Sequence, residues 1–366
     1  MTQIQIAGGG PSALACAAML AKDGIESHVH ERAPVLSPRF TNSFQVLENW
    51  TGQTPFPEQL KAAGISSDFF CKPQHSFLAY DEKMRCAEFK SKKPYWHLIR
   101  RGREPDSLDS ALLKSAQHFG AQVHFSSTLP YEQTDIFATG PSSIDGSAME
   151  TSFDADLGKD ICAVILGNKI APSGGYAYIL SDGGRVTLGT AITADLPNLA
   201  SYHRKATSLF AREFFLKESA LEKGETKASY VNFFLPKTAQ ENEKLYIGEA
   251  AGFQDLSLGI GLRYCIRSGM LAAQSILHNV EFDPLWKNEF LEKFKTAALL
   301  RIALEAAGER GISHFLSSPP KKDFQQYLSS LYAPSMLKNS LASIAMGAKR
   351  NKKCKHGARC EWCLQR

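Results

Sequence analysis

The chain has 366 residues, of which 43% are hydrophobic and 22% are charged. This length exceeds what one core usually holds, so at least two domains are expected, and the composition is typical of a globular enzyme. No apolar run reaches the roughly 18 residues of a membrane span, and residues 4–20, which come nearest, follow no basic segment. These features argue against a transmembrane helix and a signal peptide, and they predict a cytoplasmic protein.

The net charge of +5 is concentrated at the C-terminus. Residues 349–366 contain seven Lys or Arg and one Glu, which leaves the rest of the chain about neutral. The body of the protein therefore shows no bias toward nucleic acid. The tail is a candidate for contact with an anionic partner, such as acidic lipid or nucleic acid, or for a solvated end.

The segment from residue 4 to Glu31 predicts a nucleotide-binding βαβ unit. A short buried strand leads into three glycines and a small-residue helix, and a second strand ends at Glu31. Gly8, Gly10 and Ala13 fill the three positions of G-x-G-x-x-G, so that the backbone can approach a pyrophosphate at the helix N-terminus. Glu31 lies at the spacing expected for a carboxylate on a ribose 2′-hydroxyl, which disfavours NADP. By itself this segment leaves NAD and FAD open.

A second glycine-rich segment, "KLYIGEAAGFQDLSLGIGLRYCIRSGMLAAQSI", spans residues 244–276. Its pattern predicts a strand, a turn at Gly248, a loop with further glycines and a helix with a face of small residues. An NAD domain has no need of such a turn 240 residues downstream. FAD does, because its ribityl chain and ring system extend beyond the pyrophosphate.

These residues resemble the G-D-A-A-G…G-x-G flavin motif of the geranylgeranyl reductase branch of FAD-dependent oxidoreductases. That branch is related to the aromatic hydroxylases and the flavin-dependent halogenases. The resemblance implies that Glu249 contacts the ribityl hydroxyls. It also implies that the Gly259–Gly261 turn and the following helix N-terminus lie near the flavin pyrimidine ring, where the helix dipole stabilises negative charge. The sequence departs from the pattern at Glu249, where Asp is usual, and at Leu256, where Pro commonly follows Asp255.

Three further stretches are similar to the same branch: residues 100–125, 135–141 and 170–190. The resemblance implies that Arg101 lies near the FAD. Arg39 is a candidate for the phosphates or the ribityl chain by analogy, with a solvated loop arginine as the alternative. The predicted cofactor-binding residues are Gly8, Gly10, Pro11, Ser12, Ala13, Glu31, Arg32, Arg39, Arg101, Gly248, Glu249, Gly259, Ile260 and Gly261.

The predicted fold class is α/β, with a discontinuous Rossmann-like FAD-binding domain, an inserted mainly β substrate domain and a C-terminal helical region. The predicted ranges are 1–70, 100–142 and 240–280 for the FAD-binding domain, 71–99 and 143–239 for the substrate domain, 281–345 for the helical region and 346–366 for a basic Cys/His tail. In the substrate domain, strands are predicted at 75–80, 176–181, 185–192 and 228–235, and a helix at 198–219. A hinge is predicted at 317–323.

If FAD is bound, the cofactor supplies the difficult chemistry and the protein supplies placement and electrostatics. Candidate catalytic residues are His97, Tyr176 and Tyr178. The aromatic-rich strands favour a hydrophobic substrate, isoprenoid-like or aromatic. Members of the family use a cysteine in the loop after the second strand, but residues 33–44 contain none. A mechanism that relies on that thiol is therefore not expected.

The leading hypothesis is a FAD-dependent oxidoreductase that transfers hydride from flavin N5 to a C=C bond. One alternative is a flavin-dependent monooxygenase or halogenase, although the W-x-W-x-I motif of halogenases is absent. Another is a FAD-containing redox-sensing or adaptor protein that binds a partner through its tail. No second complete nucleotide fold is visible, so the reductant is expected to be transiently bound NAD(P)H or a protein electron donor.

The C-terminal segment "CKHGARCEWC" contains four potential metal ligands in ten residues: Cys354, His356, Cys360 and Cys363. Thiolate and imidazole ligands with a C-x-x-C knuckle suit zinc. An iron–sulfur cluster is an alternative, and so is a basic tail with incidental cysteines. The other five cysteines are scattered, as buried structural thiols usually are, and no disulfide framework is expected.

Overall fold

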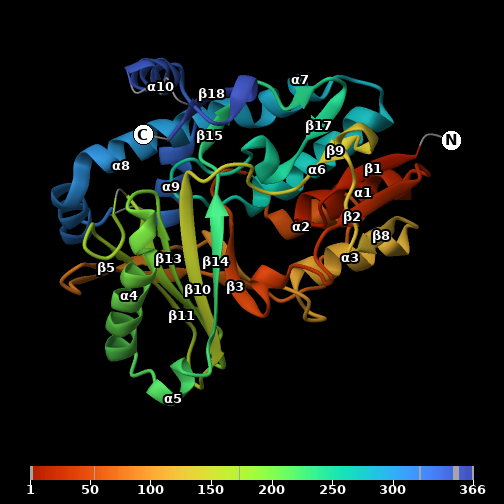
Figure 1. Ribbon diagram of the computed structural model, residues 1–366. Helices are drawn as coiled ribbons and strands as arrows, with labels where there is room; N and C mark the ends of the chain where they lie inside the picture. Colours follow the sequence, from red (N-terminus) through yellow and green to blue (C-terminus); the bar gives the residue numbers. More distant parts are fainter. Residues whose placement is uncertain (1–2, 53, 173, 321–322, 349–353, 365–366) are drawn as a thin grey trace.

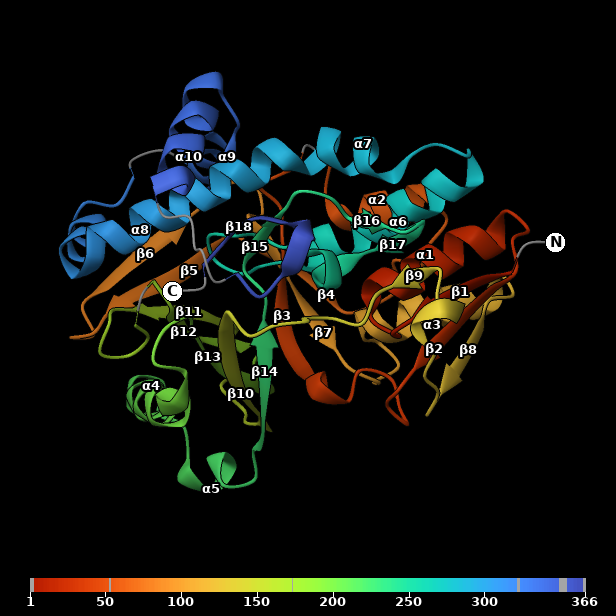
Figure 2. The same cartoon turned by 45° about the horizontal axis from the view of Figure 1, so that its top comes forward.

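The computed structural model describes residues 3–52, 54–172, 174–320, 323–348 and 354–364. Part of the hinge predicted at 317–323 and the basic residues 349–353 of the tail lie outside the described residues. Figures 1 and 2 show an α/β unit at the N-terminal end of the molecule, a large sheet flanked by α4 and α5, and a long helix, α8, that runs across both. The predicted α/β fold, with a Rossmann-type unit, an inserted β-rich part and a helical C-terminal region, is confirmed.

The Rossmann-type sheet has the strand order β16-β17-β9-β1-β2-β8. Its strands are β1 (Ile4–Ala7), β2 (Ser27–Glu31), β8 (Gln122–Phe125), β9 (Ile136–Phe137), β16 (Gln240–Glu241) and β17 (Lys244–Tyr246), and its helices are α1 (Pro11–Lys22), α3 (Leu108–His118) and α6 (Leu262–Leu277). β1 pairs in parallel with β2 on one side and β9 on the other, and β17 extends the sheet beyond β9. One sheet is therefore built from strands of three distant parts of the chain, as expected for a discontinuous domain.

Local signals account for the ends of these helices. Gly24 follows α1 with φ +83°, a conformation in which a side chain would be strained, and it stops the helix. Ser107 caps α3, because its Oγ accepts a hydrogen bond from the Ser110 N–H at 3.1 Å. Both ends follow from local residue types, because glycine tolerates a positive φ after a helix and serine is a preferred N-cap residue.

The large sheet has seven strands in the order β14-β10-β13-β12-β11-β5-β6. Its members are β5 (Ser76–Asp81), β6 (Cys86–Lys90), β10 (Gly146–Asp154), β11 (Ile161–Leu166), β12 (Tyr176–Ser181), β13 (Arg185–Ile192) and β14 (Glu225–Val231). The helices α4 (Leu199–Glu213) and α5 (Glu218–Leu221) lie beside one face, where Phe210 packs into a core with Phe153 and Leu188. The opposite face of the large sheet is not covered by these helices and lies toward the Rossmann-type unit.

The predicted strands at 176–181 and 185–192 are confirmed, whereas β10 and β11 were not predicted. Two element boundaries differ from the prediction. The helix predicted at 198–219 ends at Glu213, because Phe215 adopts a left-handed φ of +53°. The strand predicted at 228–235 is interrupted at Asn232, and its second half belongs to a separate two-stranded sheet.

A third sheet, β3-β7-β4, lies between the two larger ones, and helices from the C-terminal third complete the molecule. The elements are β3 (Ser43–Glu48), α2 (Phe56–Ala62), β4 (Cys71–Gln74), β7 (Trp96–Arg101), α7 (Phe282–Trp286), the π-helical η5 (Lys287–Leu291), α8 (Glu292–Ser317), α9 (Phe324–Tyr332) and α10 (Met336–Ala348). β4 pairs with β7 rather than with the large sheet. The exact domain ranges stay a prediction.

Short elements fill the connections. They are η1 (Pro38–Phe40), η2 (Tyr131–Gln133), η3 (Leu196–Asn198), η4 (Gly248–Ala251) and η6 (Gly357–Arg359), together with β15 (Phe234–Pro236) and β18 (Cys360–Cys363), which pair with each other. Within the described residues, no helix combines the length and the apolar character that crossing a bilayer requires. Cys86 is exposed, so the expectation that the five scattered cysteines are buried is wrong for this residue.

Candidate functional site

The two glycine-rich segments meet at the N-terminus of α1. A Cβ atom added at Gly269 on α6 would lie 2.0 Å from the carbonyl oxygen of Ser12, and one added at Gly248 would lie 2.6 Å from the Ser12 hydroxyl. Gly8 has φ +100°, and a Cβ atom there would lie 2.4 Å from the Ala138 carbonyl oxygen. These approaches need glycine because any side chain would collide with backbone. Residues predicted from segments 240 positions apart are therefore neighbours.

The first turn of α1 offers a place for an anion. Gly10 is its N-cap residue, no side chain caps the helix, and Pro11 occupies the first turn. A Cβ atom added at Gly10 would meet nothing within 4 Å, in contrast to Gly8. Uncapped N–H groups and the helix dipole together suit a phosphate. The side chains of Ser12 and Ala13 are buried, so they contribute packing at this turn.

Glu31 lies at the end of β2, directly beside the glycine turn. Its Oε2 accepts a hydrogen bond from the Gly9 N–H and its Oε1 one from the Ala33 N–H, both at 2.7 Å. Each oxygen keeps a second lone pair, with which the carboxylate can accept a hydroxyl. Arg32, the next residue, is exposed.

Glu249 and Arg39 come close on the other side of this turn. The half-buried Glu249 accepts a hydrogen bond from the Asn232 N–H at 3.0 Å. Burial raises the pKa of Glu249 to about 7, against the opposing effects of that hydrogen bond and of Arg39. The Arg39 guanidinium also lies 3.8 Å from the position of a Cβ atom at Gly140, in the stretch 135–141. The exposed Arg39 and the half-buried Glu249 thus flank the same end of the sheet.

Arg101 is held inside the protein by a buried ion pair. Its Nε and Nη2 donate to the two carboxylate oxygens of Asp109 at 2.7 and 3.0 Å, and its Nη1 donates to Gln45 at 2.5 Å. Although burial raises the pKa of Asp109, the adjacent guanidinium holds it below its usual value. Arg101 is therefore engaged with protein partners, and any contact with a ligand would use its remaining N–H groups.

The segment Gly259–Ile260–Gly261 leads directly into α6. Gly259 has φ +76°, and Gly261 is the N-cap residue of the 16-residue helix, which has no side-chain cap. Just before it, the buried Asp255 accepts hydrogen bonds from the N–H groups of Ser257 and Leu258. Burial raises the pKa of Asp255 to about 6. This loop presents an uncapped helix N-terminus toward the large sheet.

The face of the large sheet that meets this loop carries a half-buried tyrosine–glutamate pair. The Tyr176 hydroxyl donates to the Leu258 carbonyl oxygen at 2.8 Å, and the Tyr178 hydroxyl donates to Glu150. Tyr178 and Glu150 both lie opposite Gly189, on either side of it across β13. A Cβ atom at Gly189 would lie 2.1 Å from the Tyr178 ring, so the glycine opens the space in which the two side chains meet.

Burial controls the protonation of this pair. Desolvation raises the pKa of Glu150, against the effects of its hydrogen bond with Tyr178 and of Arg101. Desolvation and the Glu150 charge raise the pKa of Tyr178 well above its ordinary value. The pKa values of the phenol and of the neighbouring carboxyl group are thus both shifted upward.

His97, the third predicted catalytic residue, lies elsewhere. It is buried near the start of β7, opposite Leu47 and Pro73, and among the described residues its Nδ1 has no hydrogen-bond partner. Burial lowers its pKa, and the nearby charges of His75 and Arg263 act in the same direction. Among the described contacts, none joins His97 to Tyr176 or Tyr178.

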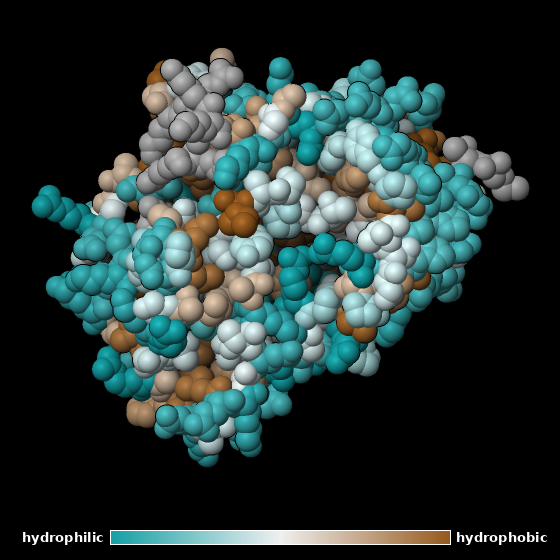
Figure 3. Space-filling view, in the orientation of Figure 1, coloured by the Kyte–Doolittle hydropathy of each residue, from teal (hydrophilic) through white to brown (hydrophobic). Residues whose placement is uncertain are grey.

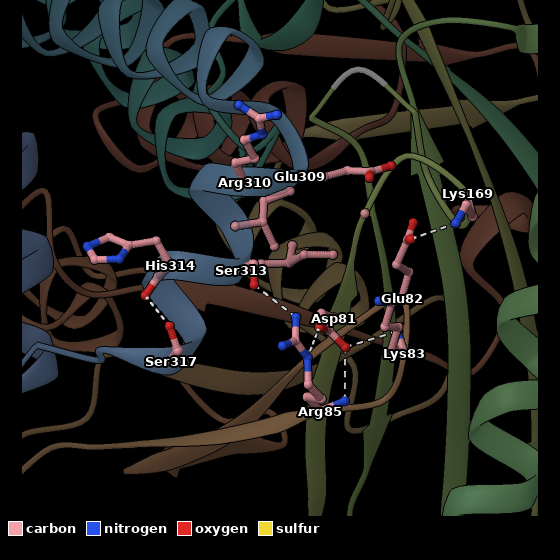
Figure 4. A pocket seen from close by; sticks show the side chains of 13 residues that line it. Asp81, Glu82, Lys83, Arg85, Lys169, Glu309, Arg310, Ser313, His314 and Ser317 are labelled. Carbon is pink, nitrogen blue, oxygen red and sulfur yellow. Dashed lines mark hydrogen bonds and ion pairs between the residues drawn. The ribbon is translucent and has the colours of Figure 1, made fainter.

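Figure 3 shows a hollow near the centre of one face, between the Rossmann-type unit and the large sheet. A separate cavity of about 520 Å³ lies against the C-terminal part of α8 (Figure 4). Its lining is mostly charged, and Arg85 bridges Asp81 on β5 and Ser313 on α8. This polar cavity is not lined by the glycine turns or the tyrosines, so it does not fit the predicted site.

The four predicted metal ligands lie together at the C-terminus. Their candidate ligand atoms are all within 4.8 Å of one another. The cluster can thus hold a metal ion, and strand β18 beside it pairs with β15. The tail from residue 354 to residue 364 is folded onto the protein, contrary to the alternative of a solvated end.

Three polar residues that contact the predicted site residues were not themselves predicted: Glu150, Asn232 and Asp145. Their signals were weak. Glu150 is an acidic residue within a strand, Asn232 stands between Val231 and aromatic residues, and Asp145 precedes a strand that was itself missed. Such positions gain meaning only from the register of distant strands.

No family model and no curated protein sequence matches the chain. Solved structures do. A geranylgeranyl bacteriochlorophyll reductase-like protein from Thermoplasma acidophilum has a TM-score of 0.69 and 18% identity, covering 93% of this chain and 95% of that one. A flavoprotein/dehydrogenase from Cytophaga hutchinsonii has a TM-score of 0.62 and 15% identity, covering 95% and 100%. The flavin-dependent brominase Bmp2 has a TM-score of 0.62 and 13% identity, covering 95% and 98%.

These matches extend over nearly the whole chain and include the branch that the sequence motifs resemble. At such identities they establish the fold. The chain has the fold of a group of flavoproteins that includes a geranylgeranyl reductase-like protein and a flavin-dependent halogenase.

Proposed function

We propose that the protein is a FAD-dependent oxidoreductase that reduces a C=C bond of a hydrophobic substrate. The residues fit the cofactor: the open first turn of α1 suits the pyrophosphate, and Glu31 suits the adenosine ribose. In this proposal Glu249 and Arg39 contact the ribityl chain and a phosphate. The uncapped start of α6 at Gly261 suits the pyrimidine end of the flavin.

When bound, reduced FAD would supply a hydride from N5 to one carbon of the double bond. A second group must then deliver a proton to the other carbon. The Tyr178–Glu150 pair is the observation that carries this proposal, because it is half-buried and lies on the sheet face whose Tyr176 contacts the loop that leads into α6.

In this scheme Glu150 carries a proton: the Tyr178 hydroxyl turns from Glu150 to give its proton to the substrate carbon, and Glu150 then donates its own proton to the phenolic oxygen. The negative charge then resides on Glu150, where the Arg101 guanidinium stabilises it. The two electrons come from the flavin, and the proton returns to Glu150 from solvent between turnovers.

The aromatic surroundings support a hydrophobic, isoprenoid-like or aromatic substrate. Tyr176 and Tyr178 are 6.0 Å apart between ring centroids, and the Phe233 ring lies next to Gly259. The reductant is NAD(P)H or a protein electron donor. The anionic partner of the basic tail and the cytoplasmic location stay predictions.

Single-turnover reduction tests the function. The flavin of the purified protein would be reduced anaerobically with dithionite and mixed with a panel of isoprenoid and aromatic alkenes. Reoxidation of the flavin with formation of one saturated product per flavin is expected for a substrate. A protein that binds FAD but whose reduced flavin is reoxidised by none of the alkenes would contradict the reductase proposal.

The similarity to a flavin-dependent brominase supports a second candidate, a monooxygenase or halogenase. Adding O₂ to the reduced protein separates the two. Slow reoxidation without product favours the reductase. Rapid reoxidation, with oxygen or halide transferred to an aromatic substrate, favours the second candidate.

A further inference from the structure

The four ligands near the C-terminus have the arrangement of a preformed metal site. Cys354 Sγ lies 3.5 Å from His356 Nδ1 and accepts a hydrogen bond from the His356 N–H at 3.4 Å. Cys360 and Cys363 stand at the two ends of β18 and complete the set. We propose that this cluster binds one zinc ion, and that the ion fastens the C-terminal strand to the loop that holds the ribityl chain.

The orientation of His356 supports a metal ligand. Its Nε2 lies 2.8 Å from Asp145 Oδ2 and 2.6 Å from the Ser143 hydroxyl, and its ring stacks on Phe234. These contacts turn Nδ1 toward the cysteines. A carboxylate on the second nitrogen of a metal-bound histidine fixes the ring and raises its basicity. Asp145 therefore acts as a positioning residue for the ligand.

The spacing favours a single ion. With a Zn–S distance of 2.3 Å, the ligand atoms of a tetrahedral site are about 3.8 Å apart. The four candidate ligand atoms all lie within 4.8 Å of one another, which agrees with this spacing. A two-iron cluster divides its four ligands between two metal ions and spreads them farther apart. Three thiolates and one imidazole around one ion form a closed structural set.

Short contacts connect the metal-binding cluster to the 248–252 loop, which is proposed to hold the ribityl chain. Arg359, between the ligands Cys354 and Cys360, donates to the Ala250 carbonyl oxygen at 3.1 Å, and its guanidinium lies 3.7 Å from the Tyr246 ring centroid. Its own carbonyl oxygen accepts a hydrogen bond from the Lys237 N–H at 2.7 Å. Ala250, within the η4 turn that begins at Gly248, is thus bound directly by the metal-binding segment.

A second connection runs through β15. Leu364 donates to the Phe233 carbonyl oxygen at 3.0 Å, and the Phe233 N–H donates to Asp145 at 2.7 Å. The neighbouring Phe234 packs beside Gly252. A Cβ atom added at Gly252 would lie 2.8 Å from the Phe234 carbonyl oxygen. Losing the ion would release β18 and leave both sides of the 248–252 loop without support. This consequence for the flavin rests on the proposed function, whereas the metal site does not.

Metal analysis of the full-length protein tests the site. We expect one zinc per chain in the wild type and in C86S, whose cysteine is exposed and far from the cluster in sequence, and less than about one tenth of that in a C360S/C363S double variant. Cobalt substitution should give the absorption of a tetrahedral cobalt–thiolate centre, at longer wavelengths than the flavin. The D145N variant should bind zinc about 10- to 100-fold more weakly. Iron with acid-labile sulfide, or equal zinc in the double variant and C86S, would overturn the proposal.

Hydrogen exchange tests the fastening without the need for flavin. Removing the metal with a chelator should speed amide exchange in residues 233–237 and 248–252 by about tenfold or more, while the β12–β13 hairpin stays unchanged. FAD affinity should fall in parallel. Unchanged exchange in both segments would overturn the coupling. A zinc-loaded protein that binds no FAD would instead contradict the proposed function and leave the metal site standing.

Discussion

The two sides of the candidate site are built by different means. On the Rossmann side the essential features are backbone: glycines at positions 8, 248 and 269 allow chain segments to touch, and the first turns of α1 and α6 have no side-chain cap. On the sheet side they are side chains, above all Tyr178 and Glu150 across Gly189. The first arrangement recognises a cofactor shared by many proteins. The second is free to vary, so it is where specificity and proton delivery are expected.

The buried ion pair that joins β7 to α3 lies between these sides and carries the largest predicted effect. Asp109→Ala leaves the buried Arg101 charge without its partner, which should lower the free energy of unfolding by about 3–5 kcal/mol. Chemical denaturation measures this loss. Asp106→Ala is the matched control, because its pair with Arg100 is half-exposed and should cost less than about 1 kcal/mol. Equal losses in the two variants would contradict the structural role given to Asp109.

The proton relay is the next test, and it concerns the sheet side alone. Tyr178→Phe should lower the rate of substrate reduction by about 10²-fold, because the phenolic proton is lost, while flavin content stays unchanged. Stopped-flow absorbance separates flavin reduction from substrate reduction. Tyr80→Phe is a matched control, since Tyr80 also donates to a glutamate, Glu213, on the far side of the molecule. A Tyr178→Phe variant as active as Tyr80→Phe would remove Tyr178 from the mechanism.

The charge of Glu249 makes the stability of the flavin-free protein depend on pH. Its pKa is about 7 in the folded protein and near 4.5 when unfolded, so the folded state holds the proton more tightly between these values. The contribution of Glu249 to the free energy of unfolding should therefore fall, by about 2 kcal/mol, as the pH rises from 4.5 to 7. Denaturation at a series of pH values measures the slope. Glu249→Gln should remove this part of it, and an unchanged slope would contradict burial of the carboxyl group.

The smallest predicted effect separates ligand contact from packing within the Rossmann side. Gly10→Ala should leave the unfolding free energy nearly unchanged, because its Cβ atom enters open space, but should weaken FAD binding about tenfold. Gly8→Ala should lower both stability and affinity, because its Cβ atom collides with Ala138. Fluorescence titration with FAD and denaturation of each apo-protein provide the comparison. If Gly10→Ala bound FAD normally, the phosphate would not lie at this turn.

The difference between the backbone side and the side-chain side of the site also explains which of its features can be predicted from the sequence. The turn at Gly8 and the hairpin strands at 176–181 and 185–192 depend on residues close together in the chain, and both were predicted. The Tyr178–Glu150 pair depends on the register of β12, β13 and β10, which local patterns do not specify. Likewise, the spacing of the C-terminal ligands suggested a metal, but the contact of Arg359 with Ala250 arises only in the folded chain.

The central claim is that the two glycine-rich segments form one flavin site. Denaturing the purified protein and identifying the released ligand by chromatography and mass spectrometry tests this claim most directly, supported by titration of the apo-protein with FAD. We predict one FAD per chain, and a Gly269→Val variant that loses it because α6 can no longer approach Ser12. A protein that releases no flavin and does not bind added FAD would contradict the account.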